Sequence, residues 1–158
     1  MTNEQFTRAV HAYTDTVYRV ALNCLKNPHN AEDVTQEVFL RLYRTAKPPE
    51  GEEHIKAWLI RVAVNECKRA LSSPWRRVLP LEEYAQTQQF SDDEKRETYE
   101  AVMALPAKYR IALYLHYYEG CSTTEMAELL GISVSAVCSR LERGRKKLKL
   151  MLLEGENV

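Results

Sequence analysis

The sequence lacks the features that most enzymes and metal proteins need. Its five glycines are isolated, so it has no glycine-rich loop of the kind that holds a phosphate. Its four histidines are scattered, and its four cysteines form neither a C-x-x-C pair nor a set with histidine at zinc spacing. We therefore expect no cofactor, no metal site and no catalytic residues, and the sequence predicts a protein that is not an enzyme.

Long apolar runs are also absent. No run reaches the length of about 18 residues that a membrane-spanning helix needs. The first ten residues contain no apolar segment of the signal-peptide type. We expect a cytoplasmic protein, in which Cys24, Cys67, Cys121 and Cys138 act as small apolar residues in a reducing compartment.

Net charge is zero, because 22 Lys and Arg balance 22 Asp and Glu among the 158 residues. The charges are unevenly distributed, however. Residues 72–100 carry seven acids and four bases, whereas residues 139–149 carry six cations and one anion. Concentrated positive charge of this kind is typical of a surface that neutralises nucleic-acid phosphates.

Apolar residues recur at three-to-four-residue spacing in the first half of the chain, and no strand pattern occurs. This spacing predicts a helix at 3–26 and a second at about 31–46, with Asn30 as its N-cap. A proline pair then requires a loop. A third helix is predicted at about 53–71, with Trp58 on its apolar side.

The second half resumes helical patterning at about residue 95, and Pro106 begins a further helix that ends at Gly120. The polar, acidic segment between the halves has the composition of a linker. The sequence therefore predicts an all-α fold with two small helical domains. Their expected bounds are a three-helix domain at 1–75, a flexible linker at 76–95 and a four-helix domain at 96–158.

Residues 122–149 have the pattern of two helices joined by a tight turn. Ser122 or Thr123 can cap the first helix, Gly131 supplies the turn and Ser133 can cap the second helix. An ordinary αα-hairpin with a solvated basic face would share this spacing. The cations that follow Ser139 favour a helix-turn-helix, whose second helix enters a DNA major groove.

Cations and an amide accompany Trp58 on the helix at 53–71. A basic groove with aromatic and amide groups suits a single strand of nucleic acid, because cations follow the phosphates and planar groups meet the bases. A core position for Trp58, with surface cations around it, explains the same residues more plainly.

Three segments together resemble a known family. They are NAEDVTQEVFLRLYR at 30–44, HIKAWLIRVAVNECKR at 54–69 and the stretch from LPAKYR to RGRKKL at 105–148. The chain resembles bacterial RNA polymerase sigma factors of the sigma-70 family. It is most similar to the short extracytoplasmic-function (ECF) group, which keeps only regions two and four.

The resemblance implies a sigma factor that binds core RNA polymerase, directs it to promoters and helps open the DNA to initiate transcription. Its partners would be core polymerase (beta-prime clamp helices and beta flap), promoter DNA and an anti-sigma factor. The implied core-polymerase-binding residues are Asp33, Gln36, Glu37 and Arg41. The implied minus-10 DNA-binding residues are Lys56, Trp58, Arg61, Asn65, Lys68 and Arg69.

The second helix of the helix-turn-helix would read the minus-35 element as duplex. The implied residues are Ser135, Ser139, Arg140, Arg143, Arg145, Lys146 and Lys147. Arg140 and Arg143 are the candidates for base contacts, and the three cations after them are candidates for phosphate contacts. Cys138 stands where the family often has a basic residue.

Two other functions fit parts of the sequence. A stand-alone helix-turn-helix regulator would bind operator DNA as a dimer without polymerase, but the first half offers no ligand-pocket pattern and no obvious dimer helix. A protein-interaction module that has lost DNA binding conflicts with the intact basic helix. Dependence on polymerase separates the sigma factor from the regulator.

Overall fold

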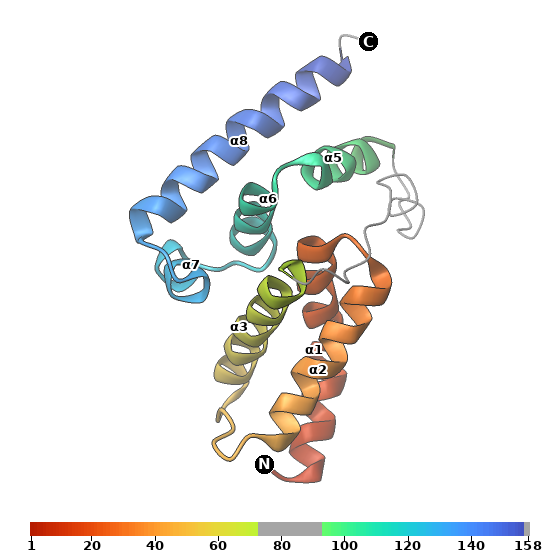
Figure 1. Ribbon diagram of the computed structural model, residues 1–158, viewed down its shortest axis with the longest axis vertical. Coiled ribbons are helices and arrows are strands. Elements are labelled where there is room, and N and C mark those ends of the chain that lie inside the picture. The colour runs from red at the N-terminus through yellow and green to blue at the C-terminus, as the bar shows by residue number, and fades with distance from the viewer. Residues whose placement is uncertain (73–92, 157–158) are drawn as a thin grey trace. The chain divides into compact units, whose positions relative to one another are not determined.

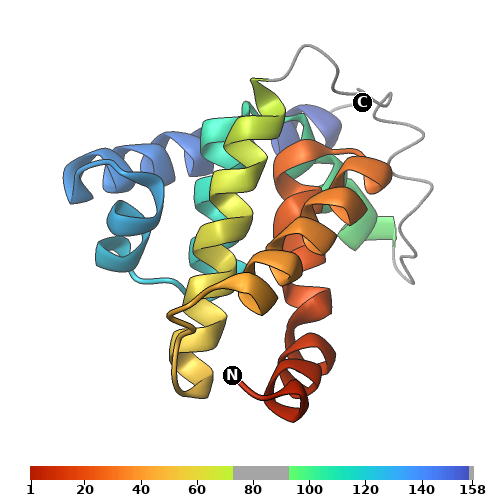
Figure 2. The same ribbon diagram turned by 60° about the horizontal axis from the view of Figure 1, so that its bottom comes forward.

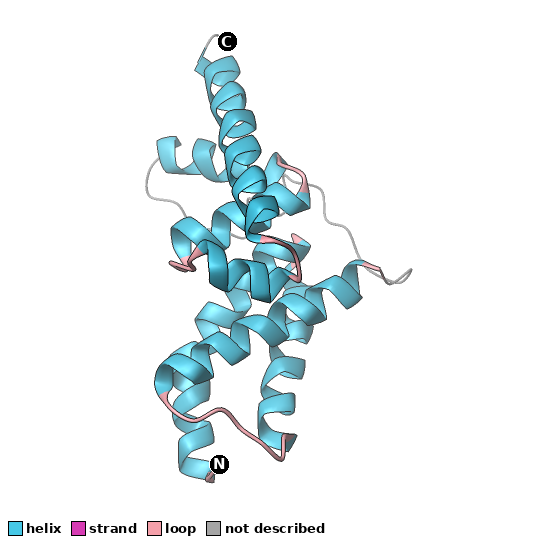
Figure 3. Cartoon of the chain, turned by 90° about the vertical axis from the view of Figure 1, so that its left-hand side faces the viewer, coloured by secondary structure: helices cyan, strands magenta, loops and turns pink. Residues whose placement is uncertain are grey.

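The computed structural model describes residues 1–72 and 93–156. The chain divides into two compact units, Met1–Val78 and Leu79–Val158, whose boundary falls outside the described residues. Every regular element in the described ranges is helical, which confirms the all-α prediction (Figure 3). The predicted linker at 76–95 also lies outside the described residues, except for its last three positions, which are helical.

The first unit is a bundle of three helices that pack on one another: α1 (Asn3–Leu25), α2 (Pro28–Arg44) and α3 (Glu52–Leu71) (Figures 1 and 2). Each helix contributes an apolar face to a shared core, as the sequence spacing predicts. The most deeply buried side chains include those of Val17, Val20, Ala21, Val38, Leu42, Leu59, Ala63 and Val64.

The start of α2 differs from the prediction. Asn27, rather than Asn30, is the N-cap, and Asn30 lies inside the first turn. The Asn27 side-chain oxygen accepts hydrogen bonds from the backbone N–H groups of His29 (2.9 Å) and Asn30 (3.1 Å). Pro28 follows at the first helical position, where its missing N–H needs no partner. The helix therefore begins three residues earlier than predicted.

We expect Asn27→Ala to lower the free energy of unfolding of the first unit by about 1–2 kcal/mol, because it leaves two N–H groups of a helix start without their acceptor. The matched variant Asn30→Ala removes the same amide one turn later and should cost less. Urea denaturation followed by circular dichroism measures both. A larger loss for Asn30→Ala would contradict the assignment of the cap.

The second unit contains α5 (Asp93–Ala104), α6 (Ala107–Leu113), a π-helical turn η1 (Tyr114–Tyr118), α7 (Thr123–Leu130) and α8 (Val134–Glu156). Helix α8 packs on α5, α6 and α7. The core includes Met103, Leu105, Leu115, Met126, Val137 and Leu141. Arg110 is also buried, and its guanidinium donates to the Leu105 carbonyl at 2.9 Å, which ties α6 to the end of α5.

The helix predicted to run from Pro106 to Gly120 changes character at Tyr114. The Glu119 N–H donates to the Tyr114 carbonyl at 3.2 Å, which closes a wider turn than an α-helix allows. The Tyr114 hydroxyl donates to Glu119 Oε1 at 2.9 Å. Tyr117 and Tyr118 lie in this wider turn and are 60% and 61% exposed. Apolar periodicity did not predict it.

The helix-turn-helix is confirmed by its backbone. Ser122 Oγ accepts from the Glu125 N–H at 3.1 Å, and Glu125 Oε1 accepts from the Ser122 N–H at 3.4 Å, which forms a capping box. Gly131 ends α7 with a φ of 67°, a left-handed conformation that glycine adopts without strain. Ser133 Oγ accepts from the Ala136 N–H at 3.0 Å and caps α8.

Cys24, Cys67 and Cys121 are buried, as expected of small apolar residues, whereas Cys138 is exposed on α8. A hydrogen bond with Cys24 and burial raise the pKa of the Cys67 thiol, so this thiol is protonated near neutral pH. Among the described helices, none combines the length and apolar character that crossing a membrane requires.

Candidate polymerase and nucleic-acid interfaces

The outer face of α2 brings together the four residues implied in polymerase binding. Asp33 and Gln36 are exposed, Glu37 and Arg41 are half-buried, and the spacing of the four places them on one side of the helix. Arg41 Nε lies 3.2 Å from Glu37 Oε1, and its Nη2 lies 2.6 Å from Glu66 Oε1 on α3. The Arg41 guanidinium is therefore held between two carboxylates.

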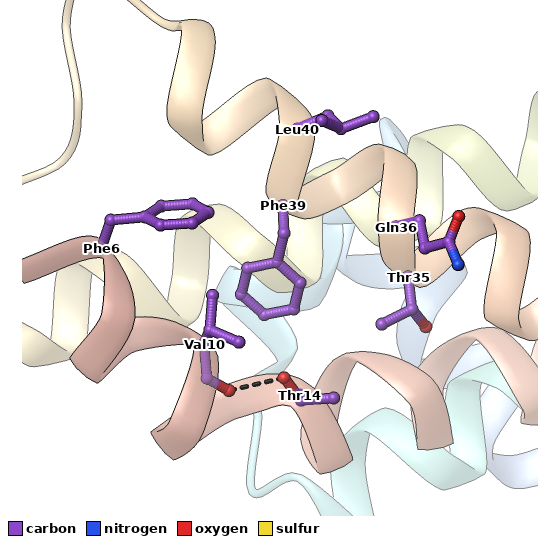
Figure 4. Close-up of a pocket in the computed structure, with 7 residues that line it drawn as sticks. All are labelled: Phe6, Val10, Thr14, Thr35, Gln36, Phe39 and Leu40. Carbon is purple, nitrogen blue, oxygen red and sulfur yellow. Dashed lines mark hydrogen bonds between the residues drawn. The ribbon is translucent and has the colours of Figure 1, made fainter. Parts of the chain in front are cut away.

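An apolar pocket of about 460 Å³ lies between α1 and α2 beside this face (Figure 4). Leu40 is 43% exposed at this pocket, and Gln36 also lines it. The other lining residues are Phe6, Val10, Thr14, Thr35 and Phe39. The sequence reasoning missed Leu40, because apolar spacing was used only to find the residues that face the core. Its position four residues after Gln36 is the signal that places it on the outer face.

Five of the six residues implied in minus-10 binding lie along one side of α3. Trp58, Arg61, Asn65, Lys68 and Arg69 follow the three-to-four spacing of a helix face. All but Trp58 are exposed, and Trp58 is half-buried. The fully buried residues of α3 lie on the other side, and they are Leu59, Ile60, Ala63, Val64 and Cys67. The indole of Trp58, at the N-terminal end of this polar row, can both pack against neighbouring side chains and stack on a base.

Lys56 does not belong to this row. It is half-buried and lies three and seven residues before Leu59 and Ala63, on the side of α3 that faces the bundle. Sequence proximity to Trp58 grouped it with the others, but helix geometry separates the two side chains by about half a turn.

The seven residues implied in minus-35 binding all lie on α8, the helix that follows the Gly131 turn. Ser135, Ser139, Arg143 and Lys146 are exposed and follow one row along the helix. Arg140 is half-buried at the edge of this row. Lys146 pairs with Glu142 at 3.2 Å, and both side chains are largely exposed. The row combines hydroxyl and cationic donors on the outer face of a capped helix, which suits a DNA groove.

Tyrosines of the neighbouring elements hold three of these cations. Arg145 donates to the Tyr117 hydroxyl, and its guanidinium carbon lies 6.0 Å from the centroid of the Tyr117 ring. Lys147 Nζ lies 5.9 Å from the centroid of the Tyr109 ring, within cation–π range. Arg143 hydrogen-bonds to Tyr109 as well.

The pKa of Tyr109 reports this environment. Burial alone would raise it above the ordinary value of 10.0, but the positive charge of Lys108 and hydrogen bonds from Arg143 and Lys108 outweigh burial and lower it. The sequence reasoning missed Tyr109 and Tyr117, because they lie outside the helix-turn-helix. Their presence on α6 and η1 means that these elements orient the basic side chains of α8.

Comparisons with known proteins agree with this arrangement of helices. Residues 9–77 match the family model "Sigma-70 region 2", and residues 95–148 match "Sigma-70, region 4". The first match covers α2 and α3 and most of α1. The second covers α6, η1, α7 and most of α5 and α8.

Relatives and a solved structure extend the match along the chain. The chain is 30% identical to the ECF RNA polymerase sigma factor SigM of Bacillus subtilis, over 92% of this chain and 93% of that protein. It is 32% identical to the ECF RNA polymerase sigma factor SigE of Mycolicibacterium smegmatis, over 89% of this chain but 58% of that relative.

Among solved structures, the fold is similar to that of the sigma factor RpoE from Bartonella quintana, crystallised with the anti-sigma factor NepR. The TM-score is 0.70 at 20% identity, over 94% of this chain and 97% of that one. At this identity the similarity concerns the fold. Together with the family models and the 30% identical relative, it leads to one conclusion. The chain belongs to the sigma-70 family of RNA polymerase sigma factors, in its ECF group.

Proposed function

We propose that this chain binds core RNA polymerase through the outer face of α2 and directs it to promoters that carry two recognition elements. The exposed acid and amide of Asp33 and Gln36 offer polar partners at the α2 face, and Leu40 adds apolar surface beside them. A mixed surface of this kind suits a specific protein interface, because apolar contact supplies affinity and polar groups fix the register.

The α3 row would hold the opened minus-10 strand. Arg61, Lys68 and Arg69 are exposed cations that can follow the phosphates, and Asn65 lies among them with an amide that can pair with a base edge. Holding an unstacked base costs a few kcal/mol, which stacking and hydrogen bonds in a pocket offset. Trp58 offers the aromatic surface for that stacking.

The single observation that carries the proposal is the outer row of α8. A recognition helix with a capped start, a glycine turn before it and an exposed row of serines and cations has the geometry of a duplex reader. Because core polymerase and promoter DNA are its proposed partners, we propose that the protein acts in the cytoplasm. An inhibitor of the anti-sigma class is a further proposed partner, since the Bartonella relative was solved with one.

Transcription in vitro with purified bacterial core polymerase tests the proposal. The template is the DNA upstream of this protein's own gene. We expect a discrete transcript only when the chain is added, because core polymerase alone does not select a promoter. A chain that shifts this DNA without polymerase and yields no transcript would be a stand-alone regulator, and the proposal would fail.

A further inference from the structure

One carboxylate in the first unit contacts an arginine from each of the two proposed interfaces. Glu66 lies on α3, and its side chain is only 11% exposed. Its Oε1 lies 2.6 Å from Arg41 Nη2 on α2 and 3.3 Å from Arg69 Nη1 on α3. Both cations meet the same oxygen atom.

The two arginines differ in their environment. The Arg41 side chain is 39% exposed, and that of Arg69 is 71% exposed. Arg41 belongs to the proposed polymerase face, and Arg69 ends the proposed minus-10 row. Glu66 therefore lies between the two surfaces, and its carboxylate is nearly buried.

A nearly buried carboxylate is tolerated only when cations and hydrogen bonds replace its water. Glu66 meets this requirement with two charge-assisted contacts, of which the one to Arg41 is the shorter, at 2.6 Å against 3.3 Å for Arg69. A long arginine side chain at a surface otherwise samples many rotamers. Contact with a fixed acceptor reduces that freedom, so each guanidinium is presented in a defined place.

We propose that Glu66 is a positioning residue that holds Arg41 at the polymerase face and Arg69 at the minus-10 row. This inference rests on the proposed function of those two surfaces. Glu66 itself contacts neither polymerase nor DNA, and it acts through the two arginines. Its effect on each ligand should therefore vanish when the corresponding arginine is absent.

The test uses the full chain with Glu66→Gln, which keeps the shape and removes the charge. Asp15→Asn is the matched control, since it removes an exposed acid of the same unit outside both surfaces. We measure the Kd of the labelled chain for core polymerase, and the Kd of the holoenzyme for a single strand that carries the minus-10 sequence. We expect Glu66→Gln to weaken each by about five-fold, within the range of measured pair couplings, and Asp15→Asn to change neither.

Double variants separate positioning from a general structural effect. In an Arg41→Ala background, Glu66→Gln should no longer change polymerase binding. In an Arg69→Ala background, it should no longer change DNA binding. Glu66→Asp keeps the charge on a shorter side chain and should fall between wild type and Glu66→Gln for both ligands.

Five outcomes overturn the inference. One is a Glu66→Gln variant that binds both ligands as the wild type does, and another is a gain in DNA affinity, which would make Glu66 a repelling charge only. Additive effects in the double variants would assign Glu66 a structural role. So would a melting temperature low enough to leave Glu66→Gln and Glu66→Asp both unfolded. If the wild-type chain itself fails to bind core polymerase, the proposed function falls, and the inference falls with it.

Discussion

Replacing both Arg140 and Arg143 with alanine is expected to remove sequence-specific binding to the minus-35 duplex. A bidentate contact between arginine and guanine discriminates by about 1–3 kcal/mol, so two such contacts account for about 2–6 kcal/mol. We expect the holoenzyme's preference for its promoter over a scrambled duplex to fall by about thirty-fold or more. Fluorescence anisotropy with both duplexes at one fixed salt concentration measures that ratio.

The two arginines have different surroundings. Arg143 is exposed on the row with Ser135 and Ser139, and it also hydrogen-bonds to Tyr109. Arg140 is half-buried at the edge of the row. Tyr109→Phe keeps the ring and removes the hydroxyl that Arg143 contacts, so it separates the loss of that internal contact from the loss of a base contact. This variant should keep most of the preference for the promoter.

Lys149→Ala is the matched control, because it removes one exposed cation of α8 outside the implied set. It should weaken binding to both duplexes equally and leave the ratio unchanged, as expected for charges that act on phosphates. Alanine at Arg145, Lys146 or Lys147 should behave in the same way, with the salt dependence of binding reduced by about 0.9 per lost phosphate contact. An unchanged ratio in the double arginine variant would assign base reading to other residues.

Local sequence rules predicted the helix-turn-helix well, because its signals lie within a few residues of one another. Ser122 with Glu125, the Gly131 turn and the Ser133 cap each depend on backbone groups up to four residues away. The predicted start of α2 was wrong for a related reason. Two asparagines three residues apart can each cap a helix, and Pro28 at the first helical position was the signal that favours Asn27.

The same local rules did not predict the contacts between helices. Nothing in the helical pattern of α3 shows that Glu66 meets Arg41 on α2, and nothing in α8 shows that Arg145 meets Tyr117 on η1. Such pairs depend on how two helices are aligned, which no single helix encodes. The π-helical turn is a similar case, since it depends on hydrogen bonding rather than on apolar spacing. The roles of the site residues stay predictions from the family resemblance.

Gly144 allows α8 to approach α6 closely. It is buried in the interior of α8. A Cβ atom at this position would lie 3.2 Å from Leu113 Cδ1 and 3.3 Å from Tyr109 Cβ. These contacts are tighter than side chains normally make, and Tyr109 Cβ is fixed by its own backbone. A side chain larger than a methyl group therefore has no space between the two helices.

We expect Gly144→Leu to lower the free energy of unfolding of the second unit by about 3 kcal/mol, the cost of forcing extra atoms into a packed contact. Replacing glycine within a helix returns about 1 kcal/mol, which is too little to offset that cost. A loss of this size lowers the melting temperature of a small domain by about 10 °C or more. Circular dichroism with thermal melting measures it.

Lys149→Leu places the same side chain at an exposed position of α8 and should melt close to the wild type. Because α6 and η1 orient the cations of α8, Gly144→Leu should also weaken binding to promoter and scrambled duplexes alike. A wild-type melting temperature would mean that α8 does not pack on α6 at Gly144.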